Sequence, residues 1–246
     1  MKDVLVITGV GKGFGRVLFE HFLNGFHVIG ITRSALDCQE ITNNQCGKQN
    51  SFDLIVSDVT NYHDLEALLM PLLDSRRKSV YGVINNAGVR FRKSLVDLTM
   101  DELKSVSEVN LFAPIFITKM LIPYFIDNGR GRIINISSIL SQSALPDLSA
   151  YTVSKAGLDG FTRSVTAEYA SHNITANSIL PGFCKTSYFD NFKQNSGLYD
   201  MTIENTPAKR WGEANELIGI CSLLLSDNGG YINGASIPVD GGWTAC

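Results

Sequence analysis

Tyr151 and Lys155 are the residues of this sequence whose types and spacing best fit proton transfer. No proline lies between Ser149 and Thr175, so this stretch is predicted to be helical, and a spacing of four places the phenol and the ammonium on one helix face. A tyrosine phenol ordinarily has a pKa of about 10, and a nearby cation favours its charged form. Such a pair suits acid–base chemistry at a carbonyl or hydroxyl group. Because Tyr-x-x-x-Lys also occurs as a plain surface pair, the rest of the chain must decide.

Seven short apolar segments alternate with stretches long enough for helices. Segments that are apolar on both faces suit the central strands of a parallel sheet that is covered on both sides. The chain is therefore predicted to be a doubly wound α/β protein with no linker that divides it. The expected strands are residues 4–7, 28–31, 52–56, 80–84, 133–136, 174–180 and 232–239.

A glycine-rich loop directly follows the first expected strand and precedes a helical pattern. It reads Thr-Gly-x-x-x-Gly-x-Gly through Thr8, Gly9, Gly13 and Gly15, which differs from the usual G-x-G-x-x-G spacing. Glycines let the backbone approach a pyrophosphate, and a helix N-terminus presents free N–H groups to it. The loop therefore predicts a dinucleotide site.

Composition argues against several other classes of protein. A net charge of -3 and a pI near 5.8 argue against a nucleic-acid partner. The first apolar run, Val4 to Ile7, is too short for a signal-peptide core and lacks a small-residue cleavage site, so a cytoplasmic location is expected. The apolar tract 111–126 is interrupted by Pro114, Lys119 and Pro123, which favours a buried helix over a membrane span. The five cysteines lack ligand spacing, so free thiols and no metal site are expected.

Further motifs follow in a characteristic order. They are Asn85-Asn86-Ala87-Gly88, Asn110, Asn135-Ile136-Ser137-Ser138, Pro181-Gly182 and Val239-Asp240-Gly241-Gly242. Together with the glycine loop and Tyr151-x-x-x-Lys155, they make the chain resemble a classical short-chain dehydrogenase/reductase over essentially its whole length. The resemblance implies one NAD(P)-binding domain over residues 1–246, with a Rossmann-type parallel sheet of about seven strands and helices on both faces.

The resemblance also implies a catalytic tetrad of Asn110, Ser138, Tyr151 and Lys155. Tyr151 would exchange the proton, and Lys155 would lower the pKa of the tyrosine and hold the nicotinamide ribose. Ser138 would hydrogen-bond the substrate oxygen, and Asn110 would hold a water that links Lys155 to solvent. Ser138 is chosen over Ser137 because it lies thirteen residues before Tyr151, as in the family pattern.

Cofactor choice depends on the end of the second strand, where an acidic residue would bind the ribose of NAD. This sequence has Arg33 there, and the glycine loop carries Lys12, which resembles the NADP(H)-preferring pattern. NADP(H) is therefore the expected cofactor, with NAD(H) as the second option. The other residues that the resemblance assigns to cofactor binding, besides Tyr151 and Lys155, are Gly9, Gly13, Phe14, Gly15, Asp58, Val59, Asn86, Ala87, Gly88, Pro181, Gly182, Cys184 and Thr186.

The substrate stays open at this level. Arg90, Arg92 and Lys93 could attract an anionic group. Residues 184–206 contain no obvious core element and are expected to form a lid, with apolar side chains from Tyr188, Phe189, Phe192, Leu198, Tyr199 and Met201.

Three functions remain. The first is a carbonyl reductase or alcohol dehydrogenase similar to 3-oxoacyl-carrier reductases. The second is an enzyme of the same fold that acts on an anionic sugar or nucleotide-sugar intermediate. The third is a dinucleotide-binding sensor or scaffold without turnover. The resemblance further implies a homotetramer or homodimer, assembled through helices at roughly 101–128 and 150–171.

Overall fold

The computed structural model describes residues 2–46, 51–186, 189, 193 and 196–245. Its main sheet has seven strands in the order β3-β2-β1-β4-β5-β6-β9, and every neighbouring pair is parallel. The strands are β1 (Val4–Thr8), β2 (His27–Thr32), β3 (Phe52–Val56), β4 (Val80–Asn85), β5 (Gly131–Ile136), β6 (Ile174–Pro181) and β9 (Ser236–Val239). The order reverses between β1 and β4, so the predicted doubly wound α/β fold is confirmed.

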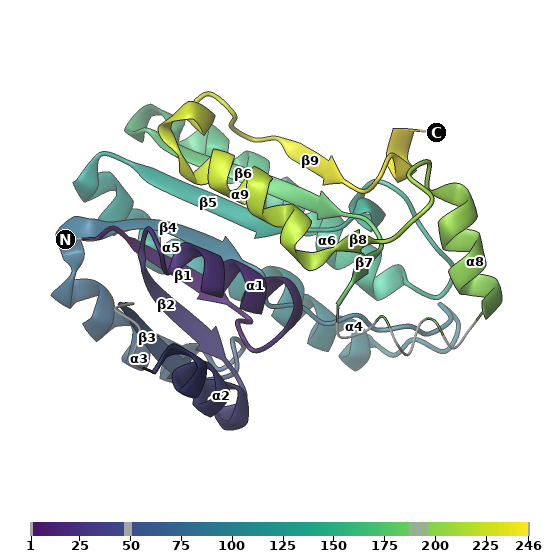
Figure 1. The fold of residues 1–246 in the computed structure, drawn as a ribbon, viewed down its shortest axis with the longest axis horizontal. Coiled ribbons are helices and arrows are strands. Elements are labelled where there is room, and N and C mark those ends of the chain that lie inside the picture. Colours follow the sequence, from purple (N-terminus) through teal and green to yellow (C-terminus); the bar gives the residue numbers. More distant parts are fainter. Residues whose placement is uncertain (1, 47–50, 187–188, 190–192, 194–195, 246) are drawn as a thin grey trace.

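Helices cover both faces of the sheet (Figure 1). One face carries α1 (Gly13–Phe22), α2 (Ala35–Gln45) and α9 (Ile218–Leu225), and the other carries α3 (Tyr62–Ser75), α5 (Ala113–Asn128) and α6 (Ser149–Tyr169). Successive strand residues point to opposite faces. Val4 and Val6 therefore join the core of α3, α5 and α6, whereas Leu5 and Ile7 join the core of α1, α2 and α9. This explains the continuous apolar run from Val4 to Ile7 in β1.

One long helical segment runs from Met100 to Asn128. It consists of α4 (Met100–Ser107), a π-helical turn (Glu108–Phe112) and α5, with Gly129 in the left-handed region at its end. By length and composition it could cross a membrane, but 56% of its most apolar window is buried. Ile117, Leu121 and Phe125 are part of the core under the sheet, so the segment packs as a core helix.

Two sequence predictions are wrong in detail. The last strand begins at Ser236 and not at residue 232, because Asn233 bonds the backbone of β6 through its side chain and Gly234 has a φ of 75°. The expected lid region is not without regular structure either. It contains α8 (Ser196–Asn205) and the short strand β7 (Cys184–Lys185), which pairs with β8 (Gly212–Glu213).

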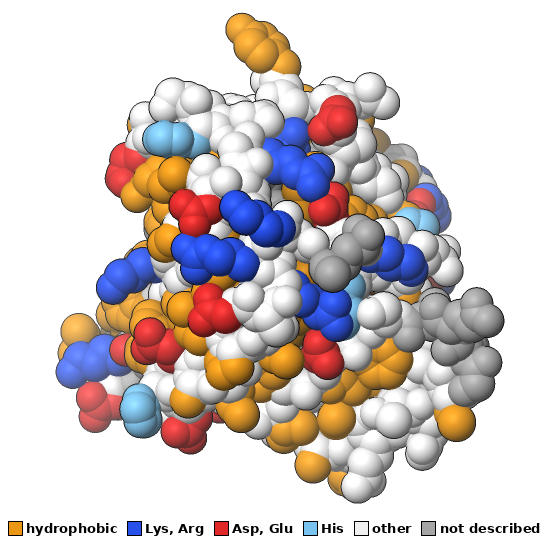
Figure 2. All heavy atoms as spheres, turned by 90° about the vertical axis from the view of Figure 1, so that its left-hand side faces the viewer, with side chains coloured by type: hydrophobic (Ala, Val, Ile, Leu, Met, Phe, Trp, Pro, Cys, Tyr) orange, Lys and Arg blue, Asp and Glu red, His pale blue; other side chains and the backbone are white. Residues whose placement is uncertain are grey.

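The two edges of the sheet differ. At the amino ends of the strands, Lys and Arg side chains lie among Asp and Glu side chains (Figure 2). Arg130 and Asp3 form an ion pair there at 2.8 Å, and Arg77 pairs with Asp127 at 2.6 Å. At the carboxyl ends, β7, β8 and α8 extend beyond the sheet (Figure 1). The sequence motifs all lie at this second edge.

Candidate active site

A cleft of about 340 Å³ opens at the carboxyl ends of the parallel strands. This is where open α/β sheets bind their ligands. Most of the predicted site residues line it: Gly9, Lys12, Gly13, Phe14, Arg33, Asp58, Val59, Asn86, Ala87, Gly88, Ser138, Tyr151, Lys155, Pro181, Gly182, Cys184 and Thr186. The fold therefore brings together residues from six separate strand ends.

The glycine loop needs glycine for two different reasons. Gly9 and Gly13 have φ values of 72° and 58°, in the left-handed region that other residues rarely adopt. Gly15 does not line the cleft. A Cβ at this position would lie 2.1 Å from the carbonyl oxygen of Gly9, so Gly15 lets α1 begin against the loop.

Two neighbouring loops are joined by hydrogen bonds beneath the cleft. Thr8 Oγ1 accepts from the backbone N–H groups of Asn86 (3.0 Å) and Ala87 (2.9 Å). In return, Asn86 Nδ2 donates to the carbonyl oxygens of Thr8 (2.9 Å) and Gly9 (3.2 Å). These bonds explain why threonine begins the glycine motif and why asparagine stands at position 86, since together they fix the loops that follow β1 and β4.

One end of the cleft carries both signs of charge. Lys12 and Arg33 line it, as predicted, and so does Asp58, whose Oδ1 accepts from the backbone N–H of Thr60 at 2.9 Å. Asp37 also lines this end, and sequence reasoning missed it. A Cβ on Gly11 would lie 2.1 Å from Asp37 Oδ2, so the carboxylate packs directly against the glycine loop. The available signal was its position in the first turn of a helix that Ser34 caps.

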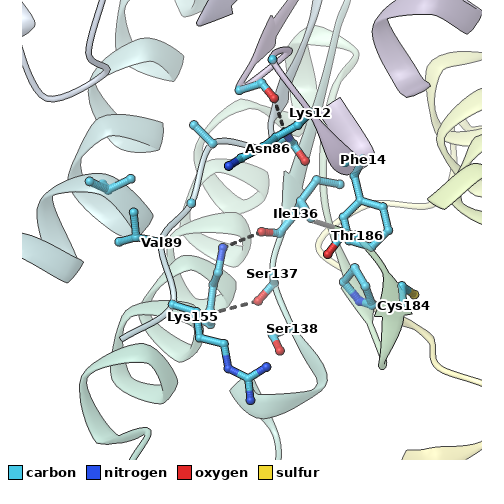
Figure 3. Close-up of a pocket in the computed structure, with 18 of the residues that line it drawn as sticks. Lys12, Phe14, Asn86, Val89, Ile136, Ser137, Ser138, Lys155, Cys184 and Thr186 are labelled. Carbon is cyan, nitrogen blue, oxygen red and sulfur yellow. Dashed lines mark hydrogen bonds between the residues drawn. The ribbon is translucent and has the colours of Figure 1, made fainter. Parts of the chain in front are cut away.

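Lys155 lies at the other end, where its amine is buried. The residue is 4% exposed, and burial lowers the pKa of its ammonium to about 8, although Asp159 acts in the opposite direction. Nζ donates to the carbonyl oxygen of Ile136 at 2.8 Å and lies 5.9 Å from the ring centre of Tyr151. Figure 3 shows the amine directed towards Ile136, on the far side of the cleft from Phe14 and Thr186.

The two serines that follow β5 have different neighbours. Ser137 Oγ donates to the backbone carbonyl of Lys155 at 3.3 Å, which ties the strand end to α6. Ser138 Oγ accepts from the N–H of Leu140 at 3.1 Å and can still donate its own proton. Both line the cleft, and this difference favours Ser138 as the residue that contacts a substrate oxygen.

Asn110 is fully buried in the π-helical turn and does not line the cleft. Its Oδ1 accepts from the N–H of Val89 at 2.8 Å, and its Nδ2 donates to the carbonyl of Val89 at 2.9 Å and to Ser154 Oγ at 3.0 Å. The side chain therefore clamps the backbone of Val89. The predicted role of Asn110 in holding a water stays a prediction.

The chain that follows β6 forms another wall of the cleft. A Cβ on Gly182 would lie 2.7 Å from the Cα of Asp240, so the chain passes close to the C-terminal motif here. Cys184 is largely enclosed, and burial raises the pKa of its thiol to about 11. The thiol is therefore protonated near neutral pH, so Cys184 is not a reactive thiolate there.

An aromatic cluster closes the far side. Trp211 lines the cleft, and its ring lies 5.4 Å from Phe183, 5.1 Å from Phe189 and 5.7 Å from Tyr199. Its indole N–H donates to Thr202 Oγ1 at 2.8 Å, which anchors the cluster on α8. Phe189 and Tyr199 were predicted in the lid, whereas Tyr188 and Phe192 lie outside the described residues.

The chemistry of the lining fits a phosphorylated dinucleotide. The glycine loop leaves backbone exposed where side chains would otherwise fill the space, and Lys12 and Arg33 supply cations at the same end. Among the described residues, no group of three His, Cys, Asp or Glu side chains could hold a metal ion.

Comparison with known proteins matches this geometry. A family model described as enoyl-(acyl carrier protein) reductase matches residues 9–244. The chain is 32% identical to 3-oxoacyl-(acyl-carrier-protein) reductase FabG of Buchnera aphidicola, over 98% of this chain and 97% of the relative. It is 30% identical to 2-dehydro-3-deoxy-D-gluconate 5-dehydrogenase of Bacillus subtilis, over 97% and 93%.

A solved structure shows the same architecture. Gluconate 5-dehydrogenase from Burkholderia cenocepacia, in complex with NADP and tartrate, superposes with a TM-score of 0.92 at 27% identity, covering 100% of this chain and 97% of that one. The family model and both relatives match nearly the whole chain, and the chain belongs to the classical short-chain dehydrogenase/reductase family.

Proposed function

We propose that the cleft catalyses reversible hydride transfer between NADP(H) and a ketone or secondary alcohol, with Tyr151 as the general acid and base. The observation that carries this proposal is that Ser138, Tyr151 and Lys155 line the same cleft as the glycine loop. The protein is an oxidoreductase of the short-chain family, so a sensor or scaffold without turnover is not favoured.

NADP(H), when bound, supplies a hydride to the carbonyl carbon or accepts one from the alcohol carbon. Tyr151 gives its phenolic proton to the carbonyl oxygen in reduction and takes the alcohol proton in oxidation. Ser138 donates a hydrogen bond to that oxygen as negative charge develops on it. The buried amine of Lys155 favours the phenolate form of Tyr151 and so makes the proton exchange easier.

NADP(H) is the cofactor that the site favours. Lys12 and Arg33 would hold the 2′-phosphate, because both cations line the end of the cleft that follows β1 and β2. The NADP complex of the gluconate 5-dehydrogenase relative supports the assignment. Asp37 lies at the same end, and its negative charge would oppose that of the 2′-phosphate. NAD(H), which lacks this phosphate, is therefore kept as a weaker cofactor.

The test compares Tyr151→Phe with the matched control Tyr231→Phe, since Tyr231 is fully exposed. We expect Tyr151→Phe to lower kcat by about 10²- to 10⁴-fold, the usual contribution of a general acid. NADPH binding, measured by fluorescence titration, should stay within about twofold of the wild type. Equal turnover by wild type and Tyr151→Phe would refute the assignment.

Relatives also favour a second, narrower candidate. Two of them are named for sugar acids, gluconate and 2-dehydro-3-deoxy-D-gluconate, whereas another is named for an acyl-carrier thioester. An anionic sugar-derived substrate is therefore the alternative to a carrier-bound one.

Assembly and location are further parts of the proposal. We infer a single catalytic domain that forms a homotetramer or homodimer through α4, α5 and α6. Two exposed apolar side chains support this: Phe112, in the π-helical turn between α4 and α5, is 44% exposed, and Val153, in α6, is 59% exposed. Free thiols at Cys38, Cys46 and Cys184 agree with a cytoplasmic location, where disulfides are rare.

A further inference from the structure

Three cations follow the segment that lines the cleft after β4, and the structure separates their roles. Arg92 pairs with Asp147 at 3.6 Å, and Lys93 donates to both carboxylate oxygens of Glu102 at 2.8 and 3.0 Å. Neither residue lines the cleft. Arg90 does line it and is half-buried. Of these three cations, Arg90 is therefore the one that lines the cleft.

The backbone on both sides of Arg90 is held in place. Val89 is clamped by the two hydrogen bonds to Asn110, and the N–H of Lys93 donates to the carbonyl oxygen of Asp147 at 2.8 Å. The ion pair of Lys93 with Glu102 holds the outgoing chain as well. The starting point of the Arg90 side chain is thus fixed relative to Ser138 and Tyr151, which a specific binding residue requires.

Charge is unevenly distributed along the cleft. Its described carboxylates are Asp37 and Asp58, which follow β2 and β3. Ser138 follows β5, and three strands, β2, β1 and β4, lie between β3 and β5. Around Ser138 and Tyr151, the described lining residues include Lys155 and Arg90 but no Asp or Glu. Lys155 is buried and donates to Ile136, and Arg90 is the other described cation on this part of the cleft.

We infer that Arg90 binds a carboxylate group of the substrate, and that the substrates are small oxo acids and the corresponding hydroxy acids. The inference rests on the proposed hydride transfer. The planar guanidinium matches a carboxylate through two parallel hydrogen bonds. The carboxylate only binds and does not react. In reduction, the carbonyl therefore still gains one hydride from NADPH and one proton from Tyr151.

A phosphate could also pair with Arg90, but the phosphate of a carrier arm lies many bonds from the reacting carbonyl. The chain on both sides of Arg90 is bonded close to Tyr151, through Asn110 to Ser154 and through Lys93 to Asp147. The position of Arg90 therefore favours an anionic group that lies near the reacting carbon, as in a small oxo acid.

The experiment uses Arg90→Gln, with Arg92→Gln as the matched control because Arg92 pairs with Asp147 outside the cleft. Steady-state rates are measured with NADP⁺ over a panel of small hydroxy acids and their methyl esters. Binding of succinate and tartrate to the protein–NADPH complex is measured by calorimetry, and NADPH binding by fluorescence.

For the wild type, we expect acids to exceed their esters in kcat/KM by about tenfold or more. Arg90→Gln should lose about 10- to 100-fold on the acids and on dicarboxylate binding, as expected for lost charge-assisted hydrogen bonds. It should leave rates with the esters and NADPH affinity within about twofold. Arg92→Gln should resemble the wild type in all of these measurements.

The inference is overturned if the wild type treats acids and esters alike, or if neither dicarboxylate binds and no acid is turned over. An equal loss of NADPH affinity in Arg90→Gln would assign the residue to the cofactor and would also overturn it. If dicarboxylates bind through Arg90 while nothing is turned over, the carboxylate site stands and the proposed hydride transfer fails.

Discussion

Gly15→Ala tests whether the glycine loop and α1 meet as described. The added Cβ would lie 2.1 Å from the carbonyl oxygen of Gly9 and 2.5 Å from Asn86 Nδ2. Both of these atoms belong to the hydrogen bonds that join the loops after β1 and β4. Because a backbone atom cannot move aside cheaply, the loop or the helix must shift. We expect a loss of about 2 kcal/mol in the free energy of unfolding, within the range for overpacked sites.

For a chain of this length, that loss corresponds to a fall in Tm of about 4–8 °C. A shifted loop would also bind the cofactor poorly. NADPH at about 100 times its Kd stabilises the wild type by about 2.7 kcal/mol, and Gly15→Ala should lose most of that gain. The assay is thermal unfolding with and without NADPH, followed by circular dichroism.

Gly25→Ala is the matched control, since a Cβ there meets nothing within 4 Å. It should change the free energy of unfolding by less than about 0.5 kcal/mol. The reasoning fails if Gly15→Ala melts with the wild type and keeps the full stabilisation by NADPH, because the close contact between Gly15 and Gly9 would then not exist.

Three further variants and one labelling experiment test other parts of the protein. Arg33→Asp should reverse a preference for NADPH over NADH of about tenfold or more, measured by fluorescence titration; equal affinities in the wild type would contradict the 2′-phosphate site. The pKa of Lys155 falls from 10.5 when unfolded to about 8 when folded, so the unfolded chain binds more protons between these values. The free energy of unfolding of the wild type, measured by urea titration, should therefore rise relative to that of Lys155→Met from pH 8 to pH 10. If both proteins show the same dependence on pH, the shift in the pKa of Lys155 is refuted. Val153→Glu should yield a smaller species in light scattering if α6 forms a subunit interface, and an unchanged mass would remove that interface. Cys184, with its raised pKa, should react with iodoacetamide at pH 8 more slowly than the exposed Cys46, as read by mass spectrometry.

Much of the fold could be predicted because strands such as β1 bury apolar residues on both faces. Leu5 and Ile7 bury one face of β1 while Val4 and Val6 bury the other, which leaves a continuous hydrophobic run in the sequence. The last strand was misjudged because Ile232 is packed into the core without being part of the ladder. That distinction depends on tertiary hydrogen bonds, which hydrophobicity does not report.

The site was predictable where a motif holds both the residue and its neighbours. Tyr151 and Lys155 share a helix turn, and Lys12 lies in the glycine loop. Asp37 was missed because its place in the cleft depends on how α2 packs against Gly11. The aromatic cluster around Trp211 was only partly foreseen, since the contacts of Trp211 with Phe183 and Tyr199 depend on how the chain folds back between these residues.

The clamp of Asn110 on Val89 has a consequence for protein engineering. The clamp separates residues 90–93 from Asn86, Ala87 and Gly88, which line the cleft before them. The hydrogen bond from the N–H of Lys93 to Asp147 fixes the other end of this segment. Position 90 can therefore be randomised while the backbone on both sides of it stays held. A library at this position would show which side chains change the preferred charge of the substrate.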